Sequence, residues 1–173
     1  MRAWLALVLI LPLAAAAQTR YFEENSGAAG RPGELPLVLP QYPKPENYLP
    51  FQVGGITPFA FFVDAKSISV GSDGVVRYSV IAKSSDGALN ISFEGMRCAD
   101  RHFRVYAFGR TDNTWSEARN SRWEPIRGDL RNAQRTVLYS DFFCPVTGDI
   151  ANAEEGVRAL QSGGNQRSTN PGY

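Results

Sequence analysis

The chain has 173 residues, with 18 basic and 17 acidic side chains and a net charge of +1. This balance argues against a general polyanion binder, because nucleic-acid-binding domains usually carry a clear basic excess. The hydrophobic fraction of 43% is ordinary for a globular protein, and the length suits one domain with a real core rather than two domains of ordinary size.

The N-terminal segment has the features of a secretory signal peptide. Arg2 supplies one positive charge, and residues 3–17 are apolar and end in small residues at Ala15 and Ala17. Such residues fit a signal-peptidase site, so we predict that residues 1–17 are removed. The apolar run is too short to span a bilayer comfortably, although a retained membrane anchor is the alternative. We therefore expect a soluble, exported protein with no integral membrane segment after cleavage.

Residues 18–34 are predicted to be a flexible N-terminus, and residues 35–58 a proline-rich arm of the domain. Seven prolines fall between Pro32 and Pro58, which excludes a long helix because proline lacks an N–H and fixes φ. The same segment carries more large apolar residues than a disordered linker would. We expect the arm to wrap the domain in polyproline-like and edge-strand conformation; a peptide-like ligand for a partner is the alternative.

The middle of the chain predicts a β-meander. The segments "SDGVVRYSV" (72–80) and "SDGALNISF" (85–93) match position for position. An Asp-Gly pair between alternating segments is a strong hairpin signal, because glycine reaches positive φ without steric cost. The predicted meander strands are "FFVDAKSISV", "VVRYSVIAK" and "ALNISFEGM".

The parity of the apolar residues predicts the two hairpin loops, since a one-residue slip moves every side chain to the other face of the sheet. The first loop should have three residues, 72–74, with Gly74 in the left-handed conformation. The second, around residues 85–86, should have two or four residues. In this register the side chains of three polar residues would point away from the core: Asn90, Ser92 and Glu94.

The C-terminal half completes the predicted fold. We expect a fourth strand at 103–109, a fifth at 135–143, and an ordered loop between them. A capping box of Asn152 and Glu155 opens one helix, which Gly163 and Gly164 end. The tail, 163–173, should be disordered. The predicted fold class is α+β: an antiparallel β-meander sheet of about five strands, an extended Pro-rich N-terminal arm and one C-terminal helix, in a single domain spanning 35–162.

The two cysteines predict a disulfide rather than a reactive site. In an exported chain, Cys98 and Cys144 are most simply bonded to each other. Once oxidised, neither is a nucleophile or a metal ligand, because both roles need the thiolate. The nearby His102 is the chain's one histidine, which leaves no zinc-ligand set and no serine–histidine–acid arrangement with a recognisable nucleophile motif. We expect no metal, no cofactor and no catalytic residue.

A carboxylate-dependent hydrolase acting on envelope saccharide or peptide is the alternative function. Such an enzyme needs two acidic side chains facing each other across a cleft. Carboxylates on strands and turns are more often simply solvated. Four acidic residues are candidates for the arrangement: Asp64, Glu94, Asp100 and Asp141.

The segment 97–131 is the predicted partner-binding surface. It combines arginine and tryptophan, which are over-represented at interaction hot spots. From Arg97 to Arg135 the sequence holds nine arginines and only five acidic residues. The alternatives are that the arginines alternate outward and pair with acids, and that the tryptophans cover the core. We expect a protein or envelope component as partner, not nucleic acid. The candidates are Arg97, Arg101, Arg104, Arg110, Trp115, Arg119, Arg122 and Trp123.

The arm "YPKPENYLPF", the run "VGSDGVVRYSVIAKSSDGALNISFEGMRC", the strand "YAFG", the tryptophan pair and "DFFCP" together resemble the cryptic neisserial protein-like family of bacterial exported proteins. The resemblance covers roughly residues 40 to 162. It implies a periplasmic or secreted protein of a Gram-negative bacterium, and it is consistent with the paired cysteines. The family brings no catalytic residues to this chain, so the sequence favours a non-catalytic binding or interaction module of the cell envelope.

Overall fold

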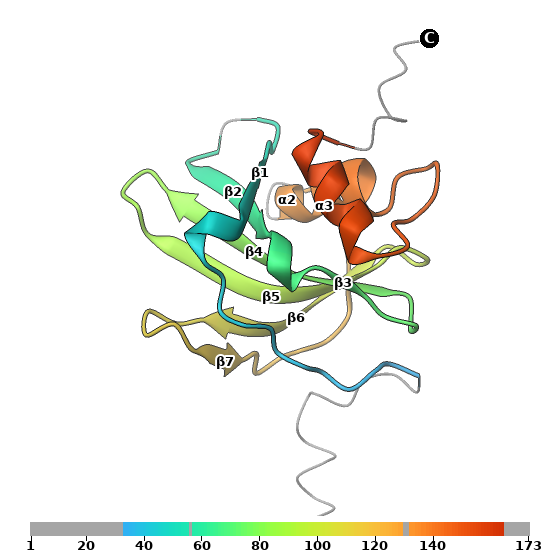
Figure 1. Cartoon of the computed structure of the whole chain (residues 1–173), viewed down its shortest axis with the longest axis horizontal. Helices are drawn as coiled ribbons and strands as arrows, with labels where there is room; N and C mark the ends of the chain where they lie inside the picture. The colour runs from blue at the N-terminus through green and yellow to red at the C-terminus, as the bar shows by residue number, and fades with distance from the viewer. Residues whose placement is uncertain (1–32, 56, 130–131, 165–173) are drawn as a thin grey trace, which may run out of the picture.

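A single antiparallel sheet forms the centre of the molecule, with helices on one face and an extended arm on the other (Figure 1). The computed structural model describes residues 33–55, 57–129 and 132–164. The predicted signal peptide, residues 18–32 of the predicted flexible N-terminus and residues 165–173 of the predicted tail lie outside the described residues. The predicted α+β class with a mainly antiparallel sheet is confirmed.

The sheet has eight strands in the described residues, rather than about five. The hydrogen-bonded order is β1-β2-β4-β5-β6-β7, with β3 added to β4 and β8 added to β6. Strand β1 comes from the proline-rich arm and is an edge strand, as expected. The strands are β1 (Tyr48–Phe51), β2 (Phe59–Asp64), β3 (Ser69–Val70), β4 (Val75–Ser84), β5 (Leu89–Arg97), β6 (His102–Gly109), β7 (Trp115–Glu117) and β8 (Glu124–Pro125).

The prediction of a fifth strand at 135–143 is wrong, because this segment is helical. Helix α2 (Ala133–Val137) continues directly into the π-helical turn η4 (Leu138–Phe143). The side chains of Leu138, Phe142 and Phe143 are all buried in the core, and their i, i+4, i+5 spacing places them on one helical face. Packing of this face against the sheet outweighs the strand preference of the local sequence.

The first hairpin loop is as predicted and the second is not. The Gly71 N–H donates to the Val75 carbonyl oxygen at 3.0 Å, which leaves residues 72–74 as the loop, with Gly74 at φ +71°. The Ser84 N–H donates to the Ala88 carbonyl oxygen at 2.9 Å. The second loop therefore also has three residues, 85–87, and the prediction of an even loop is wrong.

This register corrects the predicted orientation of the third meander strand. Tyr78 pairs with Glu94, so Asn90, Ser92 and Glu94 share the face of Tyr78 and Val80, and the Glu94 side chain is fully buried. The parity argument assumed that one face of the meander is core and the other is solvent. Both faces are covered here, so apolar residues occur at both parities.

We call the two faces the helix face and the arm face. The main core fills the helix face, where Val76, Tyr78 and Met96 pack beneath the helices. A smaller apolar cluster of Phe93, Tyr106 and Ala107 lies on the arm face and packs against Leu39 and Trp115. Neighbouring residues of one strand normally point to opposite faces, so a single strand contributes to both clusters. Tyr106 and Ala107 share the arm face because the β5–β6 register shifts by one residue between Phe93 and Glu94.

Helix α3 (Ala153–Gln161) begins as predicted. The Asn152 side chain accepts a hydrogen bond from the Glu155 N–H at 3.0 Å, and the Glu155 carboxylate accepts one from the Ala151 N–H at 2.8 Å. Gly156 is buried, and a Cβ at this position would lie 3.1 Å from carbons of Ile150 and Ile68. The missing side chain thus lets α3 pack closely against these two isoleucines. Within the described residues, no helix has the length and apolar character needed to cross a membrane.

The predicted disulfide between Cys98 and Cys144 is present and is confirmed. It links the end of β5 to the end of η4. The linked positions are 46 residues apart, and closing a loop of that length stabilises the fold by about 4 kcal/mol in the chain-entropy description.

We expect the double substitution Cys98→Ala, Cys144→Ala to lower the free energy of unfolding by about 4 kcal/mol. Denaturant unfolding of the two proteins measures this difference, and reduced wild-type protein should match the variant. A loss below about 1 kcal/mol would contradict a stabilising role for the bond.

Candidate functional site

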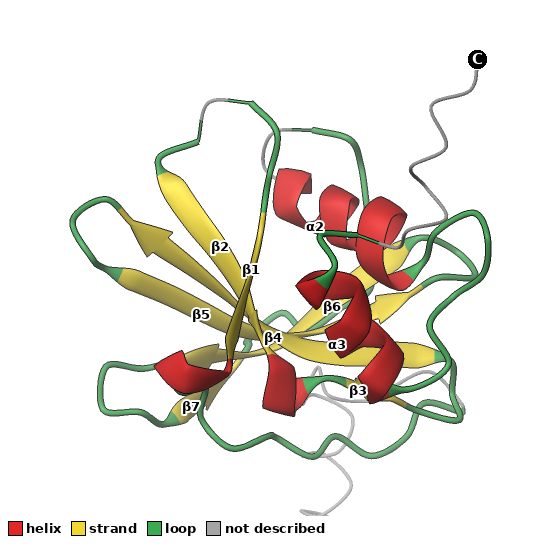
Figure 2. Ribbon diagram, turned by 45° about the horizontal axis from the view of Figure 1, so that its top comes forward, coloured by secondary structure: helices red, strands yellow, loops and turns green. Residues whose placement is uncertain are grey.

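A cleft of about 290 Å³ opens on the helix face, where the strands extend beyond the helices. Figure 2 shows α2 and α3 over one part of the sheet, while the ends of β2, β4 and β5 continue past them. We call this hollow the helix-face cleft. Its lining residues are Phe61, Val80, Ala82, Leu89, Asn90, Ile91, Ser92, Glu94, Phe108, Gly109, Gln134 and Arg135.

The floor of the cleft is a buried ion pair between Glu94 of β5 and Arg135 of α2. Arg135 binds the carboxylate through two donors: Nε at 2.8 Å from Oε2 and Nη2 at 2.7 Å from Oε1. The Ser92 hydroxyl donates to the same carboxylate at 2.7 Å, and the Arg135 guanidinium stacks 4.0 Å from the centre of the Phe103 ring. Both charges are therefore held in fixed positions.

The adjacent carboxylate keeps the Arg135 guanidinium charged. Burial alone would lower the pKa of Arg135, but the charge and hydrogen bonds of Glu94 raise it above its ordinary value. Burial, together with the adjacent Glu94 charge, raises the pKa of the Tyr78 hydroxyl well above its ordinary value. With both carboxylate oxygens engaged, Glu94 is poorly suited to proton transfer and well suited to fixing α2 on the sheet.

The walls of the cleft combine apolar side chains with two amide groups. Phe108, which pairs with Ser92 and shares its face of the sheet, is 51% exposed, and Phe61 and Ala82 add apolar surface on the same face. The side-chain amides of Asn90 and Gln134 make no hydrogen bond to any described residue. Apolar walls with a few convergent polar groups are the usual composition of a ligand pocket.

The arm face holds a second built feature, which we call the Glu34 clasp: Glu34, Arg104, Tyr106 and Trp123. The Glu34 carboxylate accepts hydrogen bonds from Arg104 Nη1 at 3.1 Å, Trp123 Nε1 at 3.1 Å and the Tyr106 hydroxyl at 2.8 Å. Burial raises the pKa of Tyr106, and its hydrogen bond to Glu34 raises it further. The clasp joins residues 70 to 89 positions apart in sequence.

Next to the clasp, Asp73 connects the arm to the sheet. Its carboxylate accepts hydrogen bonds from both terminal nitrogens of Arg77, at 3.1 and 2.6 Å, and from the Leu35 N–H at 2.9 Å. Burial raises the pKa of Asp73, but the hydrogen bonds from Arg77 and Leu35 outweigh this effect and lower it to about 2.

The structure uses four of the eight predicted partner-binding residues in contacts within the chain. Arg104 and Trp123 belong to the clasp, and Trp115 Nε1 donates to the Pro40 carbonyl oxygen of the arm at 2.9 Å. Arg97 binds Asp100 with two hydrogen bonds, at 2.9 and 2.5 Å, and stacks on the Trp123 ring. These residues hold the arm and the β5–β6 turn in place.

The other four candidates are exposed: Arg101, Arg110, Arg119 and Arg122. Arg101 lies over the Tyr139 ring, with 5.2 Å between the guanidinium carbon and the ring centre. The eight residues thus divide into a packed group on the arm face and an exposed group in and around the loops. Their predicted role in partner binding stays a prediction.

The four carboxylates considered for hydrolysis share no described pocket. Glu94 lines the helix-face cleft, Asp100 is paired with Arg97, and Asp141 is exposed on η4. Asp64 lines a separate hollow of about 420 Å³ together with Glu46, which no motif in the sequence marks. Burial raises the pKa of Asp64, and the nearby Glu46 charge adds to this.

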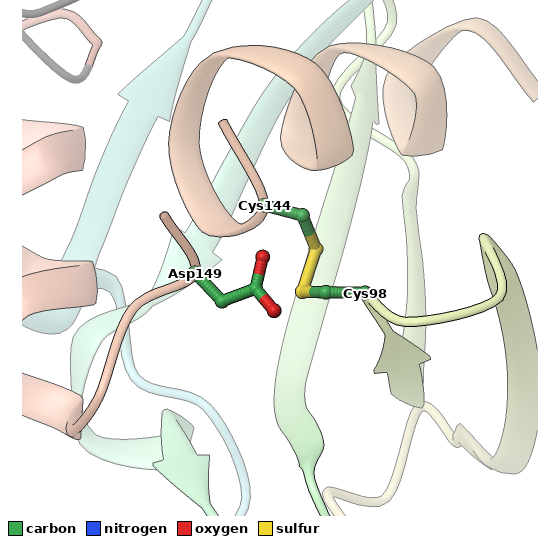
Figure 3. A group of neighbouring side chains, drawn as sticks. All are labelled: Cys98, Cys144 and Asp149. Atoms are coloured by element: carbon green, nitrogen blue, oxygen red, sulfur yellow. A yellow bond between two sulfur atoms is a disulfide. The ribbon is translucent and has the colours of Figure 1, made fainter. Parts of the chain in front are cut away.

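Cys98, Cys144 and Asp149 form a group of potential metal-ligand atoms within 4.8 Å of one another (Figure 3). The two sulfur atoms are joined in the disulfide, with the Asp149 carboxylate beside them. A disulfide sulfur lacks the thiolate charge that binds a metal, so in its oxidised form this group is a structural link. His102 is half-buried nearby, with Nδ1 2.7 Å from the Asp100 carbonyl oxygen.

Comparison with known proteins places this chain in a family. A sequence model of the CNP1-like family matches residues 32–161. The chain belongs to the CNP1-like family. It is 33% identical over 93 residues to Cryptic neisserial protein 1 from Neisseria gonorrhoeae (strain ATCC 700825 / FA 1090), a match that covers 46% of each chain. The match thus spans about half the length of this curated relative. No solved structure matches the chain.

The family agrees with the resemblance found in the sequence, but the residues that build the cleft and the clasp were mostly missed. Glu34 was assigned to the flexible N-terminus, and neither Arg135 nor Gln134 was singled out. Their partners lie tens of residues away in the chain, so no local pattern could have identified them.

We expect Arg135→Met to destabilise the protein by about 3–5 kcal/mol, because it leaves Glu94 as an uncompensated buried charge. Adding Glu94→Leu should recover most of this loss, since the second substitution removes the stranded charge. Denaturant unfolding of the two single variants and the double variant measures the coupling. Additive losses in the double variant would contradict the ion pair.

Asp73 should add stability that depends on pH. Its pKa is lower in the folded state than the ordinary value of 3.8, so its contribution is complete above about pH 4 and is lost as the pH falls through about 2. The contribution is at most about 2 kcal/mol. Comparing wild type with Asp73→Asn by thermal unfolding from pH 6 to pH 2 should give a difference that shrinks only below pH 4; a constant difference would contradict this role.

Proposed function

We propose that this protein is a non-catalytic binding module of the bacterial cell envelope and that it holds its ligand in the helix-face cleft. The observation that carries the proposal is the composition of that cleft. Phe108 presents apolar surface to solvent beside Phe61 and Ala82, and the amides of Asn90 and Gln134 are available for hydrogen bonds. An apolar patch beside unused amides suits a ligand that has both apolar and hydrogen-bonding groups, such as an envelope saccharide or an extended peptide.

The rigid floor supports binding rather than catalysis. A preformed pocket lowers the entropy cost of holding a ligand, and the Glu94–Arg135 pair and its neighbours fix the floor. Glu94 is the acidic side chain lining this cleft, and its oxygens are already engaged by Arg135 and Ser92. A general acid or base needs a side chain that can exchange a proton with the substrate.

An envelope location is part of the same proposal. The predicted signal peptide, the disulfide and the similarity to a neisserial protein all support export from a Gram-negative cell. Whether the mature protein is periplasmic or secreted is decided by fractionating cells that produce it.

The hollow beside Asp64 is the place to test the alternative, a carboxylate-dependent hydrolase. Asp64 and Glu46 both line it, and the raised pKa of Asp64 favours a group able to hold a proton. If this alternative holds, wild-type protein should cleave envelope saccharides or peptides, and Asp64→Asn should abolish the cleavage.

To test binding in the cleft, the isotope-labelled mature protein is titrated in NMR experiments with three probes: an N-acetylglucosamine oligomer, a muramyl peptide and an extended peptide of alternating leucine and serine. We expect one probe to shift the resonances of Phe108, Asn90 and Gln134 in a saturable manner. The double variant Asn90→Ala, Gln134→Ala should bind that probe about tenfold more weakly, because two hydrogen bonds are lost.

Asn120→Ala is the matched control, since Asn120 is exposed and lies outside the residues lining the cleft. It should leave affinity unchanged. The proposal fails if every probe leaves the cleft resonances unmoved, or if the double variant binds as tightly as the control.

A further inference from the structure

The hollow of about 420 Å³ beside Asp64 lies where residues 40–47 of the arm meet the end of β2. We call it the Asp64 hollow. Val63 packs in the core of the helix face, so the neighbouring Asp64 side chain points to the arm face, because successive side chains of a strand alternate. Two short helical turns border the hollow, η1 (Pro45–Asn47) and η2 (Ala65–Ser67). It shares no lining residue with the helix-face cleft.

Asp64 is a buried carboxylate without a counterion among the described residues. It is 2% exposed, and the one hydrogen bond that its carboxylate accepts from a described residue is long, from the Lys66 N–H to Oδ1 at 3.4 Å. Buried charges are normally paired or fully hydrogen-bonded. Burial raises the pKa of Asp64, as expected for a carboxylate that lacks this compensation. A cationic group that enters the hollow would supply it.

Four charged side chains line the hollow without pairing with one another. Lys44, Glu46 and Lys66 are exposed and stand around it together with Asp64. None of the four forms an ion pair with a described residue. Two positive and two negative charges leave the lining neutral overall, so a bare metal cation would meet the repulsion of both lysines. Opposite charges separated by a hollow complement a ligand that carries both signs.

The wall that the arm contributes is held by the sheet. The Tyr42 hydroxyl donates to the Arg110 carbonyl oxygen at 2.7 Å, and the Tyr42 ring packs on Trp115 with 5.4 Å between ring centres. Trp115 Nε1 in turn donates to the Pro40 carbonyl oxygen at 2.9 Å. Pro40 and Tyr42 therefore form a fixed wall that can cover the less polar part of a ligand.

The backbone that carries the charges is held as well. The Ser67 hydroxyl donates to the Asp64 carbonyl oxygen at 2.7 Å and accepts a hydrogen bond from the Ser79 N–H of β4 at 2.7 Å. The Asn47 N–H donates to the Lys44 carbonyl oxygen at 2.9 Å, which closes the turn at η1. A site whose backbone is fixed beforehand loses less entropy when a ligand binds.

We propose that the Asp64 hollow binds a small zwitterion of the α-amino-acid type, with its ammonium group against Asp64 and its carboxylate against Lys44 and Lys66. The ammonium group supplies the hydrogen-bond donors and the positive charge that Asp64 lacks. The volume of the hollow is within the usual range of small-ligand pockets. This inference is independent of the function proposed for the helix-face cleft, because the two sites share no residue.

NMR titration of the isotope-labelled mature protein with L-leucine, L-glutamine and L-lysine tests the proposal. We expect at least one of them to shift the resonances of Tyr42, Asn47 and Lys66 in a saturable manner. Shifts confined to Phe108 and Asn90 would instead report binding in the helix-face cleft. A free amino acid holds no bond for a hydrolase to cleave, so the result does not depend on the alternative function either.

Two analogues of the tightest-binding amino acid separate the two charges. Its methyl ester keeps the ammonium group and lacks the carboxylate, and its N-acetyl form keeps the carboxylate and lacks the ammonium group. Each should bind about tenfold or more weakly, because a charged hydrogen-bonded contact is lost.

Asp64→Asn removes the charge that meets the ammonium group and keeps the oxygen that accepts from the Lys66 N–H. It should weaken binding of the amino acid about tenfold or more. It should also preserve or raise the melting temperature, because it removes a buried charge that lacks a counterion; a purely structural Asp64 predicts a lower one. Asp86→Asn is the matched control, an exposed acid outside the hollow, and it should change neither quantity.

The double variant Lys44→Gln, Lys66→Gln tests the other end of the site. Both lysines are exposed, so the fold should be retained. The variant should bind the amino acid more weakly and its methyl ester as wild type does, since the ester has no carboxylate. The proposal is overturned if no amino acid moves the resonances of the hollow, if both analogues bind as tightly as the parent, or if calcium chloride moves those resonances and the amino acids do not.

Discussion

The ion pair between Glu94 and Arg135 is the constraint on which the helix face depends. The Glu94 carboxylate of β5 occupies a position in the core of the helix face. Its charge is tolerated there because Arg135 of α2 binds it through two hydrogen bonds. The pair fixes how far the helical segment extends over the sheet. What remains uncovered beyond it is the cleft, so one interaction both secures the helices and sets the boundary of the candidate binding site.

The disulfide reinforces the same arrangement. Cys98 directly follows β5, and Cys144 directly follows η4. The helical segment is therefore tied to the sheet by the disulfide at its C-terminal end and by the Glu94–Arg135 ion pair at its N-terminal end. The arm face is organised differently, because its cover is an extended segment anchored by Glu34, Asp73 and Trp115. The helices on the helix face are thus fixed by a disulfide and a buried ion pair, whereas the arm on the arm face is held by side-chain contacts.

The sequence allowed the family, the disulfide, the first hairpin loop and the capped C-terminal helix to be predicted, since each depends on a local pattern or on cysteine pairing. The second loop and the orientation of Glu94 were wrong because the parity argument needs a sheet with one solvent face. The helical segment 135–143 was also missed, because Leu138, Phe142 and Phe143 acquire their shared face only by packing on the sheet.

The candidate site was harder to predict than the fold. Arg104 and Trp123 were chosen for their chemistry, and the structure places them around a carboxylate, yet that carboxylate is Glu34 of the same chain. The Asn90 amide was expected to point away from the core, and Gln134 lies beside a predicted strand that is a helix. A cleft assembled from five separate elements (β2, β4, β5, β6 and α2) leaves no signal in the sequence of any one of them.

Residue-resolved hydrogen exchange of the mature wild-type protein tests most directly whether the arm opens at a lower free-energy cost than the helical segment. We expect amides of β4, β5 and residues 138–143 to exchange together at the rate set by global unfolding, while the Leu35 amide, which donates to Asp73, exchanges far faster through local opening of the arm. Exchange of the arm and the sheet as one cooperative unit would contradict it, as would a segment 138–143 that exchanges as readily as the arm.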